Sequence, residues 1–363
     1  MLYINILYLI NFAGKAGTEK YVSNLMHILS ARGEKCHLAY NVAGQLSETM
    51  SAEGYPCFQL EMGTRKALSA AKKLARYCRE NEIDVIHAQY PMENVIAILS
   101  KLFYKNVKVV YTNHLTIYQS TKWKILNRVF TPFDHRVIAV CRQGADIMIA
   151  NGVKKSRIQV VYNGVEPAGQ RVYDRSFARS FNVPDETFVM SIMARYAPEK
   201  GLPFLLASLA KVRRKTDKPF VCFIAGDGEE FDDFAVMCTN SKMSDCVIQL
   251  GFRRDSDKML RSSDLYLNTS SKNEAMSFAI LEAMNAGVPL VVTDVGGNRD
   301  LAQTHTVCGK VLDYGDSDGF AGAILELMEN RELLMQYSDN AIKKVSEEFD
   351  LNKLAIDVFE TYK

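Results

Sequence analysis

The chain alternates short apolar runs with longer segments in which apolar residues recur every three or four positions. The short runs are rich in β-branched residues and predict strands, whereas the longer segments predict amphipathic helices. In residues 19–31 the apolar positions fall on one stripe, with Thr18 placed to cap the helix and Gly33 to end it. Such regular alternation predicts the α/β class, with parallel sheets covered by helices on both faces. The predicted strands are residues 2–10, 36–41, 85–88, 108–112, 136–140, 158–162, 188–193, 220–225, 247–250, 265–268 and 289–293.

A stretch of turn-forming residues separates two series of strands and helices. Residues 163–169, with the sequence NGVEPAG, have no apolar period and predict a linker. A chain of 363 residues also exceeds what one hydrophobic core usually serves. We therefore expect two doubly wound, Rossmann-like domains, at 1–166 and 167–349. The tail at 350–363 predicts a helix, which we expect to pack back on the first domain.

The composition is that of a globular protein, with 48% hydrophobic and 24% charged residues. No apolar run approaches the roughly 18 residues of a membrane span. The apolar start of the chain contains Asn5 and lacks a basic leader, so it is interpreted as a strand. The eight cysteines are scattered without a C-x-x-C pair, which predicts reduced, mostly buried thiols and a cytoplasmic protein.

The two halves of the chain carry charge of opposite sign. Residues 1–166 hold 21 Lys and Arg against 12 Asp and Glu, a net charge of +9, and residues 167–363 hold 23 against 30, a net charge of −7. The basic residues gather at 65–79 and 101–136, and aromatic residues are interleaved with the second stretch. We expect this half to meet an anionic partner, which is either the inner face of the cell membrane, in a peripheral contact, or an anionic acceptor; a merely solvated face is the alternative.

In open α/β sheets ligands bind beyond the carboxyl ends of the strands, so the loops at those ends carry the candidate chemistry. After the first strand, residues 11–19 form a small-residue loop that opens a helix, where backbone N–H groups can meet a phosphate. Gly14 and Gly17 lack the spacing of the dinucleotide and P-loop fingerprints. A bare turn therefore remains the alternative to an anion site.

Two loops of the second half follow strands and carry polar or small residues. Arg195 and Lys200 flank the first of these loops, and Gly201 then opens a helix, so that two cations converge where a diphosphate would fit. The alternative is a solvated pair of cations. Gly226 and Asp227 form a tight turn that suits the close approach of a flat ligand such as a base, or is a simple strand-to-helix turn.

A further loop places Glu274 before a predicted helix and Glu282 on that helix. A carboxylate accepts hydrogen bonds from two hydroxyls at once, so two of them can hold two sugars, of which a ribose and a hexose are the natural pair. A helical glutamate is usually solvated. Glu282, however, stands among apolar neighbours, which is an unusual setting for an unpaired charge and favours a binding role.

The order of these motifs resembles glycosyltransferase family 4, the glycosyl transferases of group 1, which are retaining enzymes of the GT-B fold with two Rossmann-like domains facing a cleft. The resemblance covers nearly the whole chain. It rests on AGTEK at 16–20, AVC at 139–141, VYNGV at 161–165, residues 195–201, GDG at 226–228, LGFR at 250–253, Glu274 with Glu282, GVP at 287–289 and the pair Gly296 and Gly297.

The resemblance implies roles for the matched residues. Arg195 and Lys200 would bind the donor diphosphate, Glu282 the ribose and Glu274 the transferred sugar, while Gly17 would let the first domain approach the phosphates. The segment from Gly251 to Arg253 would lie near the base. The implied donor-binding set is Gly17, Arg195, Lys200, Gly226, Asp227, Gly251, Phe252, Arg253, Glu274, Met276, Ser277, Phe278, Ile280 and Glu282.

The resemblance also implies a histidine of the first domain beside the transferred sugar. His114, at the end of a predicted strand, occupies the corresponding place, and His87 is its rival. The implied catalytic set is His114, Glu274, Arg195 and Lys200. The chain departs from the family pattern where Ala16 and Ala194 replace glycines, which puts the backbone geometry of those two loops in doubt.

The implied activity is retaining transfer of a hexose or N-acetylhexosamine from a nucleotide-diphosphate sugar, with UDP favoured, to a hydroxyl of a glycan or lipid-linked acceptor. We expect no cofactor, no nucleic-acid partner and no metal. Asp255 and Asp257 have the D-x-D spacing of a metal site, but they stand near a predicted helix start, where N-capping explains them. The alternatives are a nucleotide-sugar epimerase of the same fold and a non-catalytic sugar-binding protein.

Overall fold

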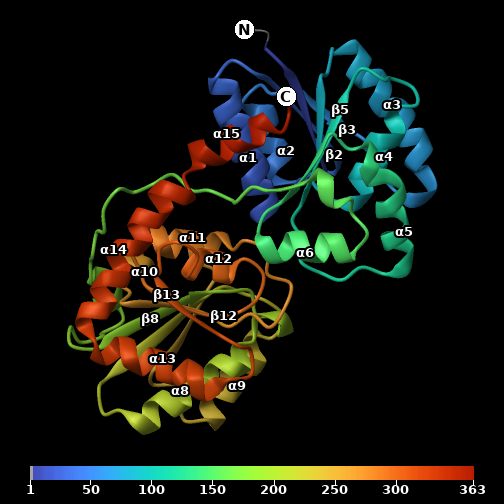
Figure 1. Cartoon of the computed structure of the whole chain (residues 1–363). Coiled ribbons are helices and arrows are strands. Elements are labelled where there is room, and N and C mark those ends of the chain that lie inside the picture. The colour runs from blue at the N-terminus through green and yellow to red at the C-terminus, as the bar shows by residue number, and fades with distance from the viewer. Residues whose placement is uncertain (1–2) are drawn as a thin grey trace. The chain divides into compact units, whose positions relative to one another are not determined.

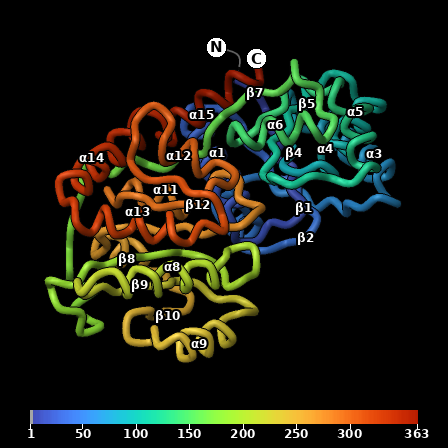
Figure 2. The backbone as a smooth tube through the Cα atoms, turned by 60° about the horizontal axis from the view of Figure 1, so that its bottom comes forward, coloured from blue at the N-terminus to red at the C-terminus, as the bar shows by residue number. Residues whose placement is uncertain are grey.

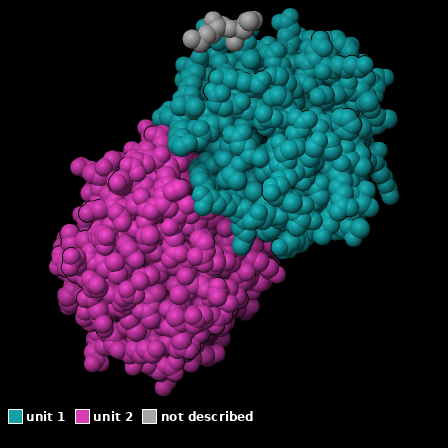
Figure 3. Space-filling view, viewed as in Figure 1, with its two compact units in different colours: residues 1–163, 351–363 teal, residues 164–350 magenta. Residues whose placement is uncertain are grey.

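A computed structural model describes residues 3–363 and divides the chain into two compact units (Figures 1 and 3). Unit 1 runs to Asn163 and resumes at Leu351–Lys363, and unit 2 is Gly164–Asp350. The change of unit therefore falls within the turn-rich stretch at 163–169.

The sheet of unit 1 is parallel, with the strand order β3-β2-β1-β4-β5-β6-β7. Its strands are near-continuous apolar runs because both faces are covered. They are β1 (Asn5–Phe12), β2 (Lys35–Val42), β3 (Cys57–Gln59), β4 (Val85–Ala88), β5 (Lys108–Asn113), β6 (Arg136–Ala139) and β7 (Ile158–Val160).

Helices cover both faces of this sheet, and side chains alternate between the two layers. Leu7 and Leu9 of β1 pack with α3 and α4, whereas Tyr8 lies against His87 and bonds to Tyr362 beyond α15. One face carries α1 (Gly17–Ala31), α2 (Gln45–Ala52) and α15 (Leu351–Glu360), and the other carries α3 (Ala67–Glu80), α4 (Pro91–Ser100), α5 (Thr121–Phe130) and α6 (Arg142–Ala150) (Figures 1 and 2).

The sheet of unit 2 is also parallel, with the order β10-β9-β8-β11-β12-β13. Its core again follows from alternation along the strands. Met190 and Ile192 pack with the layer that contains α8, and Phe223 meets Phe177 of α7 on the opposite face. The strands are β8 (Phe188–Met193), β9 (Phe220–Ala225), β10 (Val247–Gly251), β11 (Leu265–Asn268), β12 (Leu290–Thr293) and β13 (Gly309–Leu312).

The helices of unit 2 complete two layers around this sheet (Figure 1). One layer is α8 (Leu202–Lys215), α9 (Phe231–Asn240) and α13 (Ser317–Glu329), and the other contains α7 (Ser176–Ser180), α10 (Ser256–Arg261), α11 (Phe278–Asn285) and α12 (Asn298–Ala302). The long helix α14 (Arg331–Glu348) packs against α11 and α13.

Each sheet has one point where the strand order reverses direction. In unit 1 this switch point lies between β1 and β4, and in unit 2 it lies between β8 and β11. The loops at the carboxyl ends of these strands diverge, which leaves a crevice where ligands bind in folds of this kind. The switch points therefore locate the candidate site in each unit.

The doubly wound α/β architecture and the predicted strands are confirmed, with three differences. The predicted first strand began at Leu2, which lies outside the described residues, and the observed strand begins at Asn5. The edge strands β3 and β13 were not predicted. Thr18 does not cap α1, because Ala16 already takes the extended backbone conformation and the helix begins at Gly17; the Thr18 hydroxyl bonds instead to that of Tyr90, at 2.8 Å.

The predicted state of the cysteines is confirmed: the eight thiols are free, and all but the half-buried Cys57 are buried. Over residues 3–363, no helix is long and apolar enough to cross a bilayer.

Candidate functional site

An ion pair joins the two loops that flank the switch point of unit 2. Lys200 ends the short 3₁₀ turn Pro198–Lys200 that follows β8, and Glu274 lies in the loop that follows β11. The Lys200 Nζ is 2.5 Å from Oε1 of Glu274 and 3.3 Å from Oε2. The Glu274 residue is 6% exposed. A cation and a carboxylate assigned separately from the sequence thus share one contact.

Further hydrogen bonds hold the same two loops together. The Thr269 hydroxyl donates to the carbonyl oxygen of Lys200 at 3.0 Å, and the Ser271 N–H donates to that of Glu199 at 2.8 Å. Backbone and side-chain bonds of this kind fix the separation of the loops before any ligand arrives, which is the preorganisation that an electrostatic site requires.

Two glycines of the predicted motifs allow backbones to approach closely. Gly296 has φ +61°, and a Cβ there would lie 1.9 Å from the carbonyl oxygen of Glu274. Gly226 has φ +146°, and a Cβ there would meet the carbonyl oxygen of Ala194 at the same distance. At both positions a neighbouring loop of the site packs directly against the glycine, and a side chain would prevent this packing. The packing explains why a glycine stands at position 226, independently of any approach by a flat ligand.

Arg195 stands at the start of the loop after β8 and remains largely exposed. Its guanidinium forms an ion pair with Glu199, one turn further along the chain. The loop thus carries two cations, and each has a carboxylate partner. An arriving diphosphate would find both positive charges on one short turn, with the helix α8 beginning directly after it.

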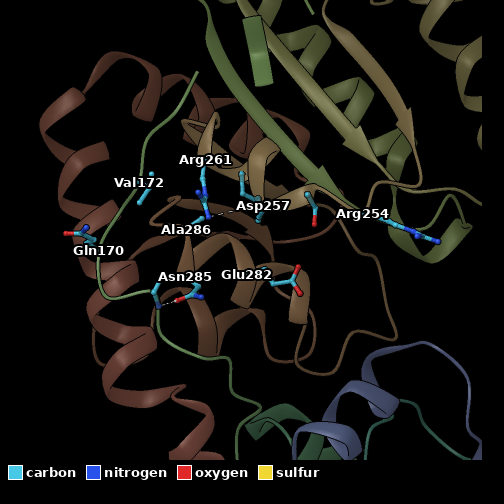
Figure 4. A pocket seen from close by; sticks show the side chains of 11 residues that line it. Gln170, Val172, Arg254, Asp257, Arg261, Glu282, Asn285 and Ala286 are labelled. Carbon is cyan, nitrogen blue, oxygen red and sulfur yellow. Dashed lines mark hydrogen bonds and ion pairs between the residues drawn. The ribbon is translucent and has the colours of Figure 1, made fainter. Parts of the chain in front are cut away.

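Glu282 lines a pocket of about 300 Å³ on the α10 and α11 face of unit 2 (Figure 4). Its neighbours Leu281, Ala283 and Met284 are buried in the core, so the carboxylate occupies the opposite stripe of α11. The setting explains the apolar sequence around this charge. The pocket is lined by Ala168, Gln170, Val172, Arg254, Ser256, Asp257, Leu260, Arg261, Glu282, Asn285 and Ala286.

Two arginines line this pocket, Arg254 and Arg261, and the sequence singled out neither of them. Arg253, which was assigned to the base, makes a bidentate ion pair with Asp255, at 2.9 and 2.8 Å, and its guanidinium lies 5.5 Å from the ring centre of Phe177. The prediction that Asp255 caps α10 is wrong in its detail: the residue holds the N-cap position, but its side chain is taken by Arg253.

The other predicted donor residues have mixed surroundings. Asp227 lies in the turn after β9, and its carbonyl oxygen accepts from the N–H of Tyr196 at 2.8 Å. The Ser277 hydroxyl caps α11 by accepting from the N–H of Ile280, which is itself fully buried. Phe252 follows Gly251 and is 54% exposed. The remaining two positions are Met276, which is buried, and Phe278, which opens α11.

Tyr266 of β11 contacts the end of β8 next to the site, and the sequence did not indicate it. Its hydroxyl accepts from the N–H of Met193 at 3.1 Å and donates to the carbonyl oxygen of the same residue at 3.4 Å. Burial raises the pKa of this phenol, and the charges of Glu274 and Glu282 raise it further. The Tyr266 hydroxyl is therefore bonded to the end of β8 and lies close enough to Glu274 and Glu282 to sense the charge of both.

In unit 1 the small-residue loop opens a helix, as predicted. Gly17 is the first residue of α1, Ala16 takes an extended conformation, and no side chain caps the helix. The N–H of Gly14 donates to Oε1 of Glu19 at 3.3 Å, which folds the loop back on its own helix.

The two candidate histidines differ in their surroundings. His87 in β4 is fully buried, with Nδ1 2.6 Å from the Tyr362 hydroxyl and Nε2 2.7 Å from the Thr112 hydroxyl. His114 follows β5 and is only partly covered, with Nε2 3.0 Å from Oε1 of Gln89. Burial lowers the pKa of each imidazole to about 3. His87 is thus committed to the core, whereas His114 stands at the carboxyl edge of the sheet.

In the described part of the chain, no three His, Cys, Asp or Glu residues lie close enough together to hold a metal ion. Independence from metal remains a prediction.

Comparison with known families covers both units. Residues 174–344 match the model of glycosyl transferases group 1, and residues 16–168 match that of glycosyltransferase family 4. Together with the parallel sheets and the paired loops, these matches define a glycosyltransferase of the GT-B fold. The chain belongs to glycosyltransferase family 4.

Curated relatives are similar over most of their length. The chain is 26% identical to the N-acetyl-α-D-glucosaminyl L-malate synthase of Bacillus anthracis, over 81% of this chain and 78% of that one. It is 24% identical to the UDP-Gal:α-D-GlcNAc-diphosphoundecaprenol α-1,3-galactosyltransferase of Escherichia coli, over 87% and 84%. Among solved structures, Anabaena HepE in complex with UDP has a TM-score of 0.86 at 22% identity, over 99% of each chain, which shows the shared fold.

Proposed function

We propose that this protein transfers a hexose or N-acetylhexosamine from a UDP-sugar to a hydroxyl of a glycan or lipid-linked acceptor, with retention of configuration and without a bound metal. The observation that carries the proposal is the ion pair of Lys200 and Glu274 at the switch point of unit 2. It places a cation suited to a diphosphate against a carboxylate suited to sugar hydroxyls, on the unit whose pocket contains Glu282.

In this proposal the cations stabilise the leaving group. As the bond between the anomeric carbon and the diphosphate breaks, negative charge grows on the phosphate oxygens, and Arg195 and Lys200 stabilise it electrostatically. The acceptor oxygen then bonds to the anomeric carbon on the same face, and its proton passes to the leaving phosphate. Glu274 holds hydroxyls of the transferred sugar, Glu282 holds the ribose, and His114 meets the transferred sugar.

The choice of donor and acceptor rests on the relatives. The E. coli relative is named for a UDP-galactose donor and a diphosphoundecaprenol acceptor, and Anabaena HepE was solved with UDP. A mycobacterial relative, 23% identical over 80% of this chain, is a phosphatidyl-myo-inositol mannosyltransferase. These names support a uridine donor and an acceptor that is lipid-linked or a glycan.

An exposed face of unit 1 supports contact with an anionic membrane. On α5, Ile125 and Val129 are 55% and 53% exposed and lie one turn apart, with Lys122 and Arg128 on the same helix. An apolar stripe with flanking cations fits a lipid surface, where each basic residue contributes about 1 kcal/mol. We call Ile125, Val129, Lys122 and Arg128 the α5 face.

A second group of cations lies on α3 of the same unit. Lys72, Arg76 and Arg79 line a cavity of about 180 Å³ together with Phe103. The α3 and α5 helices both contact α4, so they cover the same side of the sheet. This arrangement adds positive charge on the side of unit 1 that carries the α5 face.

The test of transfer is a panel of nucleotide sugars. Uridine donors are expected to raise the melting temperature, because a ligand that binds the folded state stabilises it by mass action. The stabilising donors are then incubated with candidate acceptors. Release of UDP that depends on the acceptor supports transfer, conversion of the donor sugar would indicate an epimerase, and binding without either would indicate a non-catalytic protein.

A further inference from the structure

Gln89 occupies the switch point of unit 1 and is fully buried. It follows β4 directly, and its N–H donates to the carbonyl oxygen of Leu9 in β1 at 3.1 Å. A polar side chain in this position must find partners inside the protein, because an unsatisfied buried amide is costly. Its two partners come from the histidines of the unit.

The hydrogen bonds of Gln89 fix the orientation of its amide. Nε2 lies 3.0 Å from the carbonyl oxygen of His87, which can only accept a hydrogen bond. The NH₂ group therefore faces that carbonyl, and Oε1 faces the other way. Oε1 lies 3.0 Å from Nε2 of His114.

The orientation of Gln89 in turn decides the tautomer of His114. An amide oxygen can only accept, so the hydrogen of this second bond belongs to Nε2 of His114. In a neutral imidazole the other nitrogen, Nδ1, then carries a lone pair and can only accept. The carbonyl oxygen of His87 thus sets the orientation of the Gln89 amide, and the amide sets the tautomer of His114.

The surroundings of His114 keep the ring neutral. Burial lowers the pKa of His114 to about 3, so the cation is absent at neutral pH. The titratable groups against the ring are Tyr21 of α1, at 4.9 Å between ring centres, Tyr90 before α4, at 6.1 Å, and His87 of β4. The carboxyls in this region are Glu19 and Glu93. Burial raises the pKa of Tyr90, and the charges of these two carboxyls raise it further.

We propose that Gln89 is a positioning residue that holds His114 as the Nε2–H tautomer, so that Nδ1 accepts a hydrogen bond from a hydroxyl of the transferred sugar. The inference rests on the proposed function, in which His114 meets that sugar. It also restricts the donor class. A hexuronate carboxylate in the same place would present a second acceptor to Nδ1, so neutral hexoses with a hydroxyl there are favoured over hexuronates.

The tautomer can be measured without substrate. In protein labelled with ¹⁵N-histidine, long-range ¹H–¹⁵N correlation distinguishes the two neutral tautomers and the cation. The His114 signals are assigned by their loss in His114→Asn. We expect the Nε2–H tautomer alone between pH 6 and pH 8. A mixture of tautomers, the Nδ1–H form or the cation would overturn the proposal.

Two variants of Gln89 test the effect on chemistry. Their assay is hydrolysis of UDP-sugars by water, which needs no acceptor. Gln89→Leu removes the acceptor of the Nε2–H bond, and we expect kcat for UDP-glucose to fall about ten- to a hundredfold, as it does when a metal-binding histidine loses the partner that orients its ring. UDP affinity should stay unchanged, because the proposed nucleotide site belongs to unit 2. Unchanged kcat in a folded Gln89→Leu protein would contradict the proposal.

Gln89→Glu keeps an acceptor in the same place but adds a negative charge that favours the imidazolium. The imidazolium has no lone pair at Nδ1, so hydrolysis of UDP-glucose should fall as the pH is lowered through the new pKa of His114. The wild type should show no such limb above pH 5. At pH 6 the variant should use UDP-glucuronate, relative to UDP-glucose, about tenfold better than the wild type does, the effect of one charge-assisted hydrogen bond.

The outcomes separate this inference from the proposed function. If the wild type binds and hydrolyses no UDP-hexose and transfers none, the proposed function fails, whatever the spectrum of His114 shows. If the wild type turns over UDP-glucose but folded Gln89→Glu keeps the wild-type pH profile and donor ratio, the role of Gln89 fails and the transferase remains.

Discussion

The ammonium of Lys200 lies 2.5 Å from Oε1 of Glu274, and the two residues follow the two strands that border the switch point of unit 2. A donor diphosphate that binds Lys200 would compete with this carboxylate. Exchange of partners would then release Glu274 toward the transferred sugar, so one contact can couple recognition of the phosphates to recognition of the sugar.

The first prediction follows from this competition. Glu274→Gln keeps the size of the side chain and removes its charge, so UDP should bind within about threefold of the wild type or more tightly, a change below about 1 kcal/mol, while turnover of the UDP-sugar falls. Calorimetry with UDP measures the affinity. A folded Glu274→Gln protein that binds UDP ten times more weakly would show that Glu274 does not hold the transferred sugar alone.

The second prediction concerns Glu282, which is proposed to hold the ribose that UDP retains after transfer. A hydrogen bond to a charged group contributes about 1.5 to 3 kcal/mol, so Glu282→Ala should weaken UDP binding by about ten- to a hundredfold. Asn285→Ala, in the same pocket and on the same helix, is the matched control for altered packing. Equal losses of UDP affinity in both variants would assign the effect to the pocket as a whole.

The third prediction separates protein cations from metal. Because Lys200 and Arg195 are proposed to stabilise the diphosphate, a chelator should leave turnover nearly intact, whereas Lys200→Ala should lower kcat by about a hundredfold. Steady-state assays with and without chelator, at matched ionic strength, measure both effects. Activity that a chelator abolishes and Mg²⁺ restores would refute a site built from side-chain cations.

The fourth prediction concerns a buried carboxyl of unit 1. Glu93, in the first turn of α4, is 1% exposed, and burial raises its pKa to about 7. Because the folded value lies above the ordinary value of 4.5, the folded chain binds a proton that the unfolded chain has lost. The stability from this group is complete below about pH 4.5 and is lost as the pH rises to about 7.

Glu93→Gln removes this dependence and should raise the stability of unit 1 at pH 8 by about 3 kcal/mol at most. Burial also raises the pKa of Asp134, so the loss of stability with rising pH should lessen in Glu93→Gln and lessen further when Asp134→Asn is added. Burial lowers the pKa of His87 and His114, which adds a slope of opposite sign below about pH 6.5 in every variant. Melting temperatures between pH 5 and pH 8 measure the slopes. Parallel slopes in the wild type and the double variant would rule out these carboxyls as its source.

The fifth prediction tests the α5 face. The protein should sediment with vesicles that contain anionic phospholipid at low salt and be released at high salt, because surface attraction is screened. Ile125→Asp with Val129→Asp should abolish sedimentation. Val236→Asp on α9 is the control, since Val236 is equally exposed but lies in unit 2. No binding by the wild type at low salt would leave the α5 face as a solvated surface.

The sequence predicted most strands because they are buried on both faces and therefore apolar throughout. β3 and β13 could not be predicted in this way, because few of their residues are buried. They are short edge strands, and β3 has no fully buried residue. Their pairing is set by the neighbouring strand rather than by their own composition.

The site was predicted less completely because its contacts join loops that are distant in the chain. The loops that carry Arg195, Lys200, Glu274 and Glu282 could be found from small residues and charges at strand ends. Nothing local distinguishes Arg254 from Arg253, because only the ion pair of Arg253 with Asp255 shows which arginine remains to line the pocket. Tyr266 and Gln89 have no local signal either, since their roles depend on which loops they meet.

The position of Tyr362 has a consequence for synthesis of the chain. Its hydroxyl bonds to His87 inside unit 1, yet residues 164–350 must be translated between the two. At about 5 to 20 residues per second, the ribosome would need roughly 10 to 40 s for that interval. Until residues 351–363 have been synthesised, the first half lacks the contact of α15 with α1, and His87 lacks its hydrogen bond to Tyr362. Unit 1 can therefore complete its fold only after unit 2 has been synthesised.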